Sequence, residues 1–145
     1  MKLNNKLSKF YKNDIPCKLG KNINTGHLSI KVRNKETGKP ITFAEVSLYF
    51  LNIKGLYGES GEANLIVRYV TDGEGNVPII ELPVIDKRIF PLSEYYMTVN
   101  HFRYYPVNIM NVEVYPNVTT EYNILLTPLT SKHPDYEFII TPIRP

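Results

Sequence analysis

The feature that most constrains the fold is a tight polar turn placed between two apolar runs. Residues 70–83 read Val-Thr-Asp-Gly-Glu-Gly-Asn-Val-Pro-Ile-Ile-Glu-Leu-Pro. The Asp-Gly and Gly-Asn pairs favour the positive φ angles of a short hairpin turn, and the flanking β-branched residues favour strands. We therefore predict a β-hairpin with both glycines at turn positions and with core-facing side chains at Val70, Val77, Ile79 and Leu82.

The same alternation of apolar and polar residues recurs along the chain and predicts further strands. Eleven prolines and eight glycines divide the chain into short segments, which argues against long helices. The segment 83–94 mixes prolines and charges and should carry the chain between sheets. The sequence predicts an all-β, seven- or eight-stranded Greek-key β-sandwich. We expect strands at residues 26–33, 44–50, 65–71, 77–82, 95–99, 107–115, 122–126 and 136–141.

The length of 145 residues and the hydrophobic content of 43% suit one domain with one packed core. Charge is distributed unevenly, because residues 1–25 hold six lysines and one aspartate, a local balance of 6 − 1 = +5, whereas the whole chain carries +3. We predict a basic N-terminal arm over residues 1–25, followed by a single sandwich domain over residues 26–145.

Several function classes find no support in the sequence. No stretch approaches the roughly 20 apolar residues of a membrane span, and no apolar signal region begins the chain, so we expect synthesis in the cytoplasm without a signal peptide. Cys17 is the single cysteine, so no disulfide forms within the chain. His27, His101 and His133 are too far apart for the usual metal spacing. We expect no cofactor, no metal and no nucleic-acid partner.

Two polar motifs are better explained as turns than as ligand sites. Asp72, Glu74 and Asn76 occupy the first, third and fifth places of a calcium loop, but Val77 and Pro83 stand where such a loop needs Gly and Glu. The glycine-rich segment 55–61 lacks the Gly-Lys-Ser/Thr ending that cradles phosphate. Both are predicted to be surface turns or loops.

Five short motifs follow one another in an order that is similar to a known family, the carboxypeptidase regulatory-like domain, over residues 26 to about 128. They are Gly26-x-Leu28-x-Ile30-x-Val32, Thr37-Gly38-Lys39-Pro40-Ile41-x-x-Ala44-x-Val46-x-Leu48, Thr71-Asp72-x-x-Gly75, Tyr95-x-Met97-x-Val99 and Tyr122-x-Ile124-x-Leu126. The resemblance implies a transthyretin-like, seven-stranded Greek-key sandwich. It also implies an accessory, folding or adhesive role beside a partner rather than catalysis.

A narrower resemblance involves the end of the domain. Residues 112–120, Val-Glu-Val-Tyr-Pro-Asn-Val-Thr-Thr, and residues 126–129, Leu-Thr-Pro-Leu, are similar to the version that accompanies peptidoglycan hydrolases of clostridial spores. This resemblance implies a spore association and a hydrolase on a separate chain. The chain departs from the family at Arg103-Tyr104, where Gly-Tyr is usual, so the turn there must take another shape.

A fainter similarity points to an enzyme. His27, together with Thr37–Pro40 and Thr71-Asp72, resembles hydroxyisourate hydrolase, a transthyretin-fold enzyme that uses histidines and an arginine. The terminal Tyr-Arg-Gly-Ser of that family is absent, because this chain ends Thr-Pro-Ile-Arg-Pro. A small hydrolase is therefore the third hypothesis, and no catalytic residue is assigned.

The candidate binding residues are Tyr96, Arg103, Tyr104 and Tyr105. Alternation directs the neighbours of Tyr96 inward and Tyr96 outward, and tyrosine and arginine are enriched in binding hot spots. The leading hypothesis is a non-catalytic module that binds a protein or a cell-wall polysaccharide. The alternative is a structural subunit of a larger assembly, such as a spore coat or phage particle, joined through an exposed sheet edge.

Overall fold

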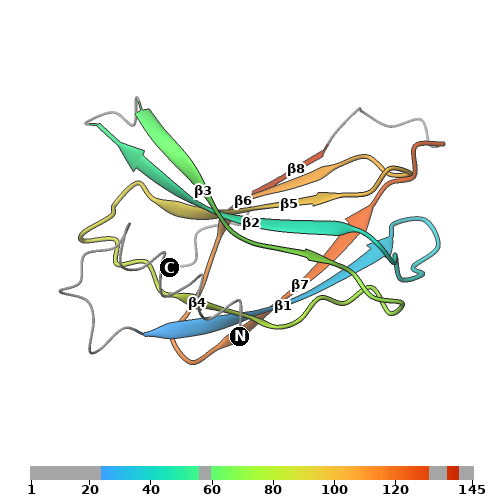
Figure 1. Ribbon diagram of the computed structural model, residues 1–145, viewed down its shortest axis with the longest axis horizontal. Coiled ribbons are helices and arrows are strands. Elements are labelled where there is room, and N and C mark those ends of the chain that lie inside the picture. Colours follow the sequence, from blue (N-terminus) through green and yellow to red (C-terminus); the bar gives the residue numbers. More distant parts are fainter. Residues whose placement is uncertain (1–23, 56–59, 131–136, 141–145) are drawn as a thin grey trace.

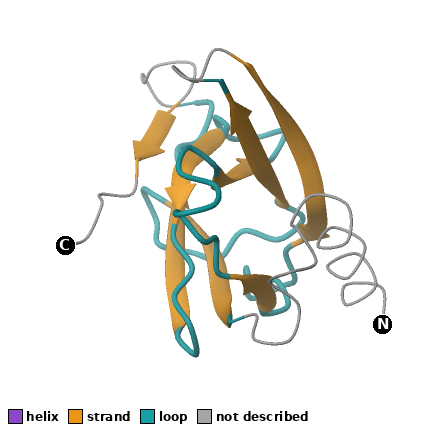
Figure 2. Cartoon of the chain, turned by 90° about the vertical axis from the view of Figure 1, so that its left-hand side faces the viewer, coloured by secondary structure: helices purple, strands orange, loops and turns teal. Residues whose placement is uncertain are grey.

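The computed structural model describes residues 24–55, 60–130 and 137–140, and these residues form two facing β-sheets (Figures 1 and 2). The smaller sheet has the strand order β4-β1-β7 and the larger sheet the order β3-β2-β5-β6-β8. The predicted fold class, an all-β sandwich of seven or eight strands, is confirmed, with eight strands in the described residues. The strands are β1 (Thr25–Asn34), β2 (Glu45–Lys54), β3 (Ser60–Val70), β4 (Ile80–Pro83), β5 (Glu94–Asn100), β6 (Val107–Val112), β7 (Thr119–Leu126) and β8 (Glu137–Ile140).

The core lies between the inner faces of the two sheets, where alternate residues of the predicted strands are excluded from solvent. Burial of a large apolar side chain contributes about 1.5–3 kcal/mol, so these rows fix which face of each strand meets the core. The inward rows of β1, β2 and β5 are Leu28, Ile30 and Val32, then Val46, Leu48 and Phe50, then Tyr95, Met97 and Val99, all at most 1% exposed.

Strand β1 is central in the smaller sheet. It runs parallel to β7 from His27 to Asn34 and antiparallel to β4 over residues 25–28. Beyond β4, its second edge is bonded to loop residues: the Val32 N–H donates to the Gly75 carbonyl at 2.8 Å, and the Ile41 N–H donates to the Val32 carbonyl at 3.0 Å. Both edges of β1 are therefore occupied.

Residues 70–83 do not form the predicted hairpin. β3 pairs with β2 in the larger sheet, whereas β4 pairs with β1 in the smaller sheet, so the turn carries the chain from one sheet to the other. Val77 and Leu82 are buried as predicted, but Val70 and Ile79 are 53% and 58% exposed. Because the chain changes sheets after Val70, the alternation of β3 does not continue into β4.

The predicted turn is confirmed by its hydrogen bonds. Asp72 Oδ1 accepts the backbone N–H groups of Glu74 at 2.9 Å and Asn76 at 3.0 Å. Gly75 has φ of 77°, and a Cβ there would lie 2.4 Å from the Val32 carbonyl oxygen. At Gly73 φ is not positive and a Cβ would meet nothing within 4 Å, so Gly73 lies in the turn as predicted, but the positive φ expected for it was wrong.

Other predicted boundaries differ by a few residues. β2 and β3 are longer than predicted, so the glycine-rich segment 55–61 is mostly strand or outside the described residues. The predicted strand 136–141 is observed as β8, paired parallel with β6. The arm predicted for residues 1–25 falls, up to residue 23, outside the described residues, as does His133. No helix among the described residues could cross a membrane.

We expect Gly75→Ala to destabilise the domain by about 1–3 kcal/mol, because the added methyl group meets a backbone oxygen and the backbone stays at positive φ. Gly73→Ala in the same turn is the matched control and should change the stability by less than about 0.5 kcal/mol. Urea unfolding followed by circular dichroism measures both. Equal urea midpoints for the two variants would contradict the close contact between the turn and β1.

Candidate binding surface

The structure places three of the four predicted binding residues in one turn and the fourth on a sheet face. Arg103, Tyr104 and Tyr105 lie between β5 and β6, and Tyr96 lies on β5. Arg103 is exposed, whereas the three tyrosines are half-buried. The predicted residues therefore lie in two places, on the larger sheet and in the turn at one end of it.

Tyr104 and Tyr105 hold the turn in place. The Tyr104 hydroxyl accepts a hydrogen bond from Asn34 Nδ2 at 3.3 Å, and its ring packs against the core. The Tyr105 N–H donates to the Thr127 carbonyl at 2.9 Å. These contacts hold the turn against the ends of β1 and β7. The side chains that the turn presents to a partner are therefore mainly those of residues other than Tyr104 and Tyr105.

Two phenylalanines beside this turn are strongly exposed. Phe102 is 84% exposed and Phe43 is 74% exposed. The His101 ring stacks on Phe102 with centroids 4.8 Å apart and hydrogen-bonds the backbone of Thr42, which precedes Phe43. His101 thus connects the two loops that carry the phenylalanines.

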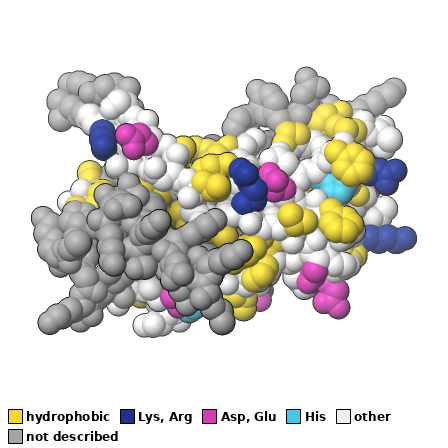
Figure 3. Space-filling model, viewed as in Figure 1, with side chains coloured by type: hydrophobic (Ala, Val, Ile, Leu, Met, Phe, Trp, Pro, Cys, Tyr) yellow, Lys and Arg dark blue, Asp and Glu magenta, His cyan; other side chains and the backbone are white. Residues whose placement is uncertain are grey.

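We call Phe43, His101, Phe102 and Arg103 the aromatic patch. The Arg103 guanidinium carbon lies 5.9 Å from the Phe102 ring centroid, within the range of a cation–π contact. Figure 3 shows hydrophobic side chains beside basic ones at the right-hand end of the molecule, the end where β5 and β6 are joined in Figure 1. The patch is thus a basic, aromatic surface at one end of the sandwich.

Phe43 is held in an unusual conformation. Its φ is 61°, in a region that residues other than glycine rarely adopt and that costs on the order of 1–3 kcal/mol. Hydrogen bonds on both sides impose it: the Phe43 N–H donates to the Thr71 carbonyl at 3.0 Å, and the Ala44 N–H donates to Thr71 Oγ1 at 2.9 Å. Strain of this kind concentrates at functional sites.

Sequence reasoning missed both phenylalanines. Phe43 lies in the short loop before a strand, and Phe102 lies in a turn, so alternation assigned neither to a face. A signal was present in residues 101–105, His-Phe-Arg-Tyr-Tyr, where aromatic and basic residues cluster. The sequence does not indicate which of these rings points into solvent.

The pKa of His101 lies below its usual value. Burial is the main cause, and the nearby Arg103 charge adds to it, while the hydrogen bond to the Thr42 backbone works in the opposite direction. Nδ1 accepts the backbone N–H of Arg103 at 3.1 Å. The ring is therefore neutral at pH 7 and accepts a hydrogen bond that a protonated ring would lose.

Because the folded-state pKa of His101 is below the unfolded value, the unfolded chain binds the proton more readily. The contribution of His101 to stability is present above about pH 6.5 and is lost as the pH falls toward the folded-state pKa. We expect the urea midpoint to fall more between about pH 7.5 and pH 5.5 for the wild type than for His101→Asn. Identical pH dependence in both proteins would contradict this role.

On the outer face of the larger sheet, a row of side chains runs across four strands, and we call Arg68, Tyr49, Tyr96 and Asn108 the tyrosine row. The Tyr96 hydroxyl donates to Asn108 Oδ1 at 2.5 Å, and its ring centroid lies 5.9 Å from that of Tyr49. Arg68 lies within 3.5 Å of the Tyr49 hydroxyl and of a Glu45 carboxylate oxygen. Burial, with a smaller effect of Tyr49, raises the pKa of Tyr96.

The tyrosine row adjoins the aromatic patch. Glu45 lies opposite Asn100 in the β2–β5 ladder, and these two residues are close in sequence to Phe43 and His101 respectively. The predicted outward direction of Tyr96 and the inward direction of its neighbours on β5 are confirmed. The tyrosine row therefore lies on the strands that lead to the aromatic patch, with Tyr96 four ladder positions before Asn100.

The residues of the hydrolase hypothesis are not brought together. His27 lies near the start of β1, where its Nε2 is 3.3 Å from a Glu81 carboxylate oxygen. Asn34, at the other end of β1, is seven residues after His27 and thus about 23 Å from it along the strand. Segment Thr37–Pro40 lies beyond Asn34. The structure separates the histidine from the motif that would have completed such a site.

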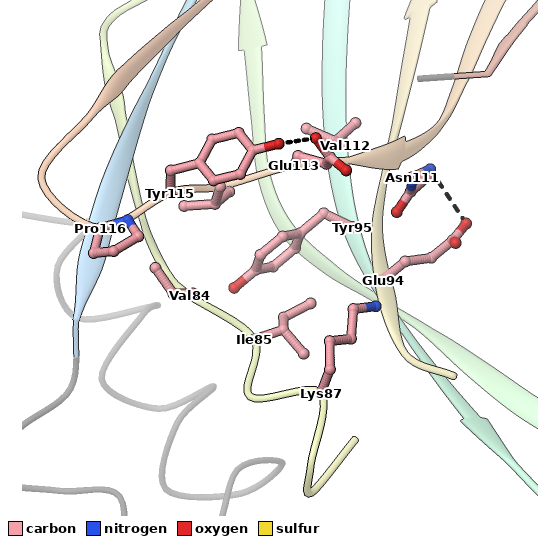
Figure 4. A pocket seen from close by; sticks show the side chains of 11 residues that line it. Val84, Ile85, Lys87, Glu94, Tyr95, Asn111, Val112, Glu113, Tyr115 and Pro116 are labelled. Atoms are coloured by element: carbon pink, nitrogen blue, oxygen red, sulfur yellow. Dashed lines mark hydrogen bonds between the residues drawn. The ribbon is translucent and has the colours of Figure 1, made fainter. Parts of the chain in front are cut away.

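A cavity of ≈ 230 Å³ lies at the end of the sandwich away from the aromatic patch (Figure 4). Its polar groups are bonded within the protein: Glu94 accepts the Asn111 N–H at 3.3 Å, Tyr115 donates to Glu113, and Lys87 donates to a backbone carbonyl. The remaining walls are mostly apolar and include Val84, Ile85, Tyr95, Val112, Val114 and Pro116. Each of these polar side chains therefore has at least one hydrogen-bond partner within the protein.

Comparison with known proteins supports the fold. No family model and no curated protein matches the chain. Among solved structures, the TIE protein of Bacillus anthracis is 17% identical with a TM-score of 0.50, and the match covers 72% of this chain and 17% of that protein. Wild-type catechol 1,2-dioxygenase of Acinetobacter radioresistens is 12% identical with a TM-score of 0.50, and the match covers 86% of this chain and 60% of the enzyme.

At these identities the likeness shows the fold alone. The chain spans less than two thirds of either protein. Together with the strand order, the comparisons confirm the predicted transthyretin-like β-sandwich, and they assign no activity.

Proposed function

We propose that this domain is a non-catalytic binding module that captures a partner through the aromatic patch and the adjoining tyrosine row. The observation that carries the proposal is the pair of phenylalanines, Phe43 and Phe102, at 74% and 84% exposure on loops that hydrogen bonds hold rigid. Burying each ring in an interface would contribute about 1.5–3 kcal/mol. Because the loops are already ordered, little conformational entropy is lost on binding.

The partner we propose is a spore or cell-wall peptidoglycan hydrolase on a separate chain. The motifs shared with carboxypeptidase regulatory-like domains, and with the versions that accompany clostridial spore hydrolases, support an accessory role beside such an enzyme. The chemistry of the surface supports a protein partner, since aromatic residues and arginine are enriched at the centres of protein interfaces. Spore association forms part of the same proposal.

We expect Phe102→Ala and Phe43→Asn each to weaken binding to a spore cortex hydrolase by at least about tenfold, as is typical of hot-spot residues. Asn tolerates positive φ, so Phe43→Asn removes the ring without adding strain. Tyr96→Ala and Arg103→Ala should weaken binding as well. Isothermal titration calorimetry with the purified hydrolase measures the affinity, and thermal melting checks that each variant is folded.

Val118→Ala is the matched control, because Val118 is 46% exposed and lies on the β6–β7 connection, outside the patch and the row. Unchanged affinity in Phe102→Ala and Phe43→Asn, or an equal loss in Val118→Ala, would refute the proposed surface. Binding to purified spore peptidoglycan without the hydrolase would identify the polysaccharide as the partner. Turnover of hydroxyisourate or of catechol by the purified protein would refute the non-catalytic role.

A second candidate function, a structural subunit of a larger assembly, is favoured by the edge of the larger sheet. β3 is eleven residues long, and among the described residues it pairs only with β2. Leu65 and Val70 on this strand are 44% and 53% exposed. A long edge strand with exposed apolar residues is a template for pairing with another chain.

Light scattering after size-exclusion chromatography separates the two candidates. A binding module should elute as a monomer at all concentrations tested, whereas an assembly subunit should form larger species that grow with concentration. Leu65→Lys should abolish those larger species, since a charge on an edge strand opposes pairing. A monomer that Leu65→Lys leaves unchanged would exclude assembly through β3.

A further inference from the structure

The outer face of the smaller sheet carries a second surface with a different character. An open groove of ≈ 440 Å³ runs along β1 and is bordered by β7 and by the segment that follows the Thr71–Asn76 turn. Its polar lining includes two cations, one carboxylate, two amides and a serine hydroxyl. The residues that supply these groups are Ser29, Lys31, Arg33, Asn76, Glu121 and Asn123.

The strand register explains why these side chains share one face. Lys31 lies opposite Asn123 in the parallel β1–β7 ladder and opposite Asn76 at an isolated bridge on its other side. Because opposed residues of a sheet point to the same face, the lysine stands between two amides. Arg33 follows two residues later on the same face, about 6.6 Å along the strand.

These groups have unused hydrogen-bonding capacity. Within the described part of the chain, the side chains of Lys31, Arg33, Asn123 and Glu121 have no hydrogen bond or ion pair. Arg33 Nε is shielded from solvent and also has no partner. An unpaired buried donor is unfavourable, so a hydrogen-bond acceptor placed beside the guanidinium group would stabilise this site.

The backbone of β1 contributes nothing to such a ligand. Its two edges are paired with β7 on one side and with β4 and the Gly75–Val77 segment on the other. An extended peptide therefore cannot add as a strand at this position, because strand addition needs a free edge. Recognition must come from side chains, which favours a ligand rich in hydroxyl or amide groups.

We propose that this groove binds a carboxylate-bearing saccharide. Arg33 and Lys31 would hold the carboxylate, since guanidinium–carboxylate hydrogen bonds are charge-assisted and strong. Asn76 and Asn123 would bond hydroxyl or acetamido groups, and the 58% exposed Ile79 offers an apolar contact for a sugar face. The groove is separate from the aromatic patch, which belongs to the other sheet and its end.

Two pairs of saccharides test the proposal on the full chain. N-acetylmuramic acid and N-acetylglucosamine differ by the lactyl group that bears the carboxylate, and the methyl ester of trigalacturonic acid replaces its charged carboxylates by neutral methyl esters. We expect at least one of the acids to shift backbone amide resonances of residues 29–33, 76 and 121–123 in NMR titrations up to about 10 mM. Its neutral counterpart should bind at least about tenfold more weakly. Binding of N-acetylmuramic acid would indicate a cell-wall sugar as the ligand, and binding of trigalacturonic acid would indicate a uronate.

Arg33→Gln and Lys31→Gln should each weaken binding of the acid by at least about fivefold, while retaining the cooperative unfolding of the wild type. Lys39→Gln, in the exposed turn after β1, removes the same charge outside the groove and should leave the affinity unchanged. Phe102→Ala should also leave the affinity for the acid unchanged. This variant therefore distinguishes failure of the proposed role of the aromatic patch from failure of the proposed role of the groove.

Three results of these saccharide titrations would overturn the proposal. They are the absence of shifts with both acids, equal binding of acid and neutral counterpart, and an equal loss of affinity in Lys39→Gln. Tighter binding of a glutamate-containing tripeptide than of either acid would assign the groove to a peptide and overturn the saccharide class.

Discussion

The arrangement of this domain depends on the corner formed by residues Thr71–Asn76. Thr71 is buried, and its hydroxyl donates to the Ile41 carbonyl at 2.7 Å while it accepts the Ala44 N–H. The same corner offers the Gly75 carbonyl to the N–H of Val32 on β1. One turn thus bonds to the central strand of the smaller sheet and to the loop that begins β2 in the larger sheet.

That corner also determines the character of the candidate surface. By bonding both sides of Phe43, Thr71 fixes a conformation that directs a phenylalanine ring into water instead of the core. His101 then connects this loop to the turn that carries Phe102. The aromatic patch is therefore rigid because the two sheets are fastened at this end, and a rigid exposed ring loses less entropy on binding than a flexible one.

The outer faces of the two sheets differ in how their polar groups are used. On the larger sheet, Arg68, Tyr96 and Asn108 take part in hydrogen bonds with neighbours on adjacent strands. On the smaller sheet, Lys31 and Arg33 have no such partners among the described residues. A surface whose polar groups are already paired suits an aromatic protein contact, whereas unpaired groups need a polar ligand.

The sequence by itself determined the approximate positions of the strands, the inward faces of β1, β2 and β5, and the position of the Asp72 turn. These features are local, because alternation along one strand and an aspartate bonding its own backbone involve only nearby residues. Tertiary structure decided which strands pair. The residues between Val70 and Leu82 suit a hairpin and a crossover equally well. Whether β4 pairs with β3 or with β1 depends on contacts with strands that are distant in the sequence. The exposure of Phe43 and the meeting of Lys31, Asn76 and Asn123 follow from that pairing, because each joins segments that are distant in the chain.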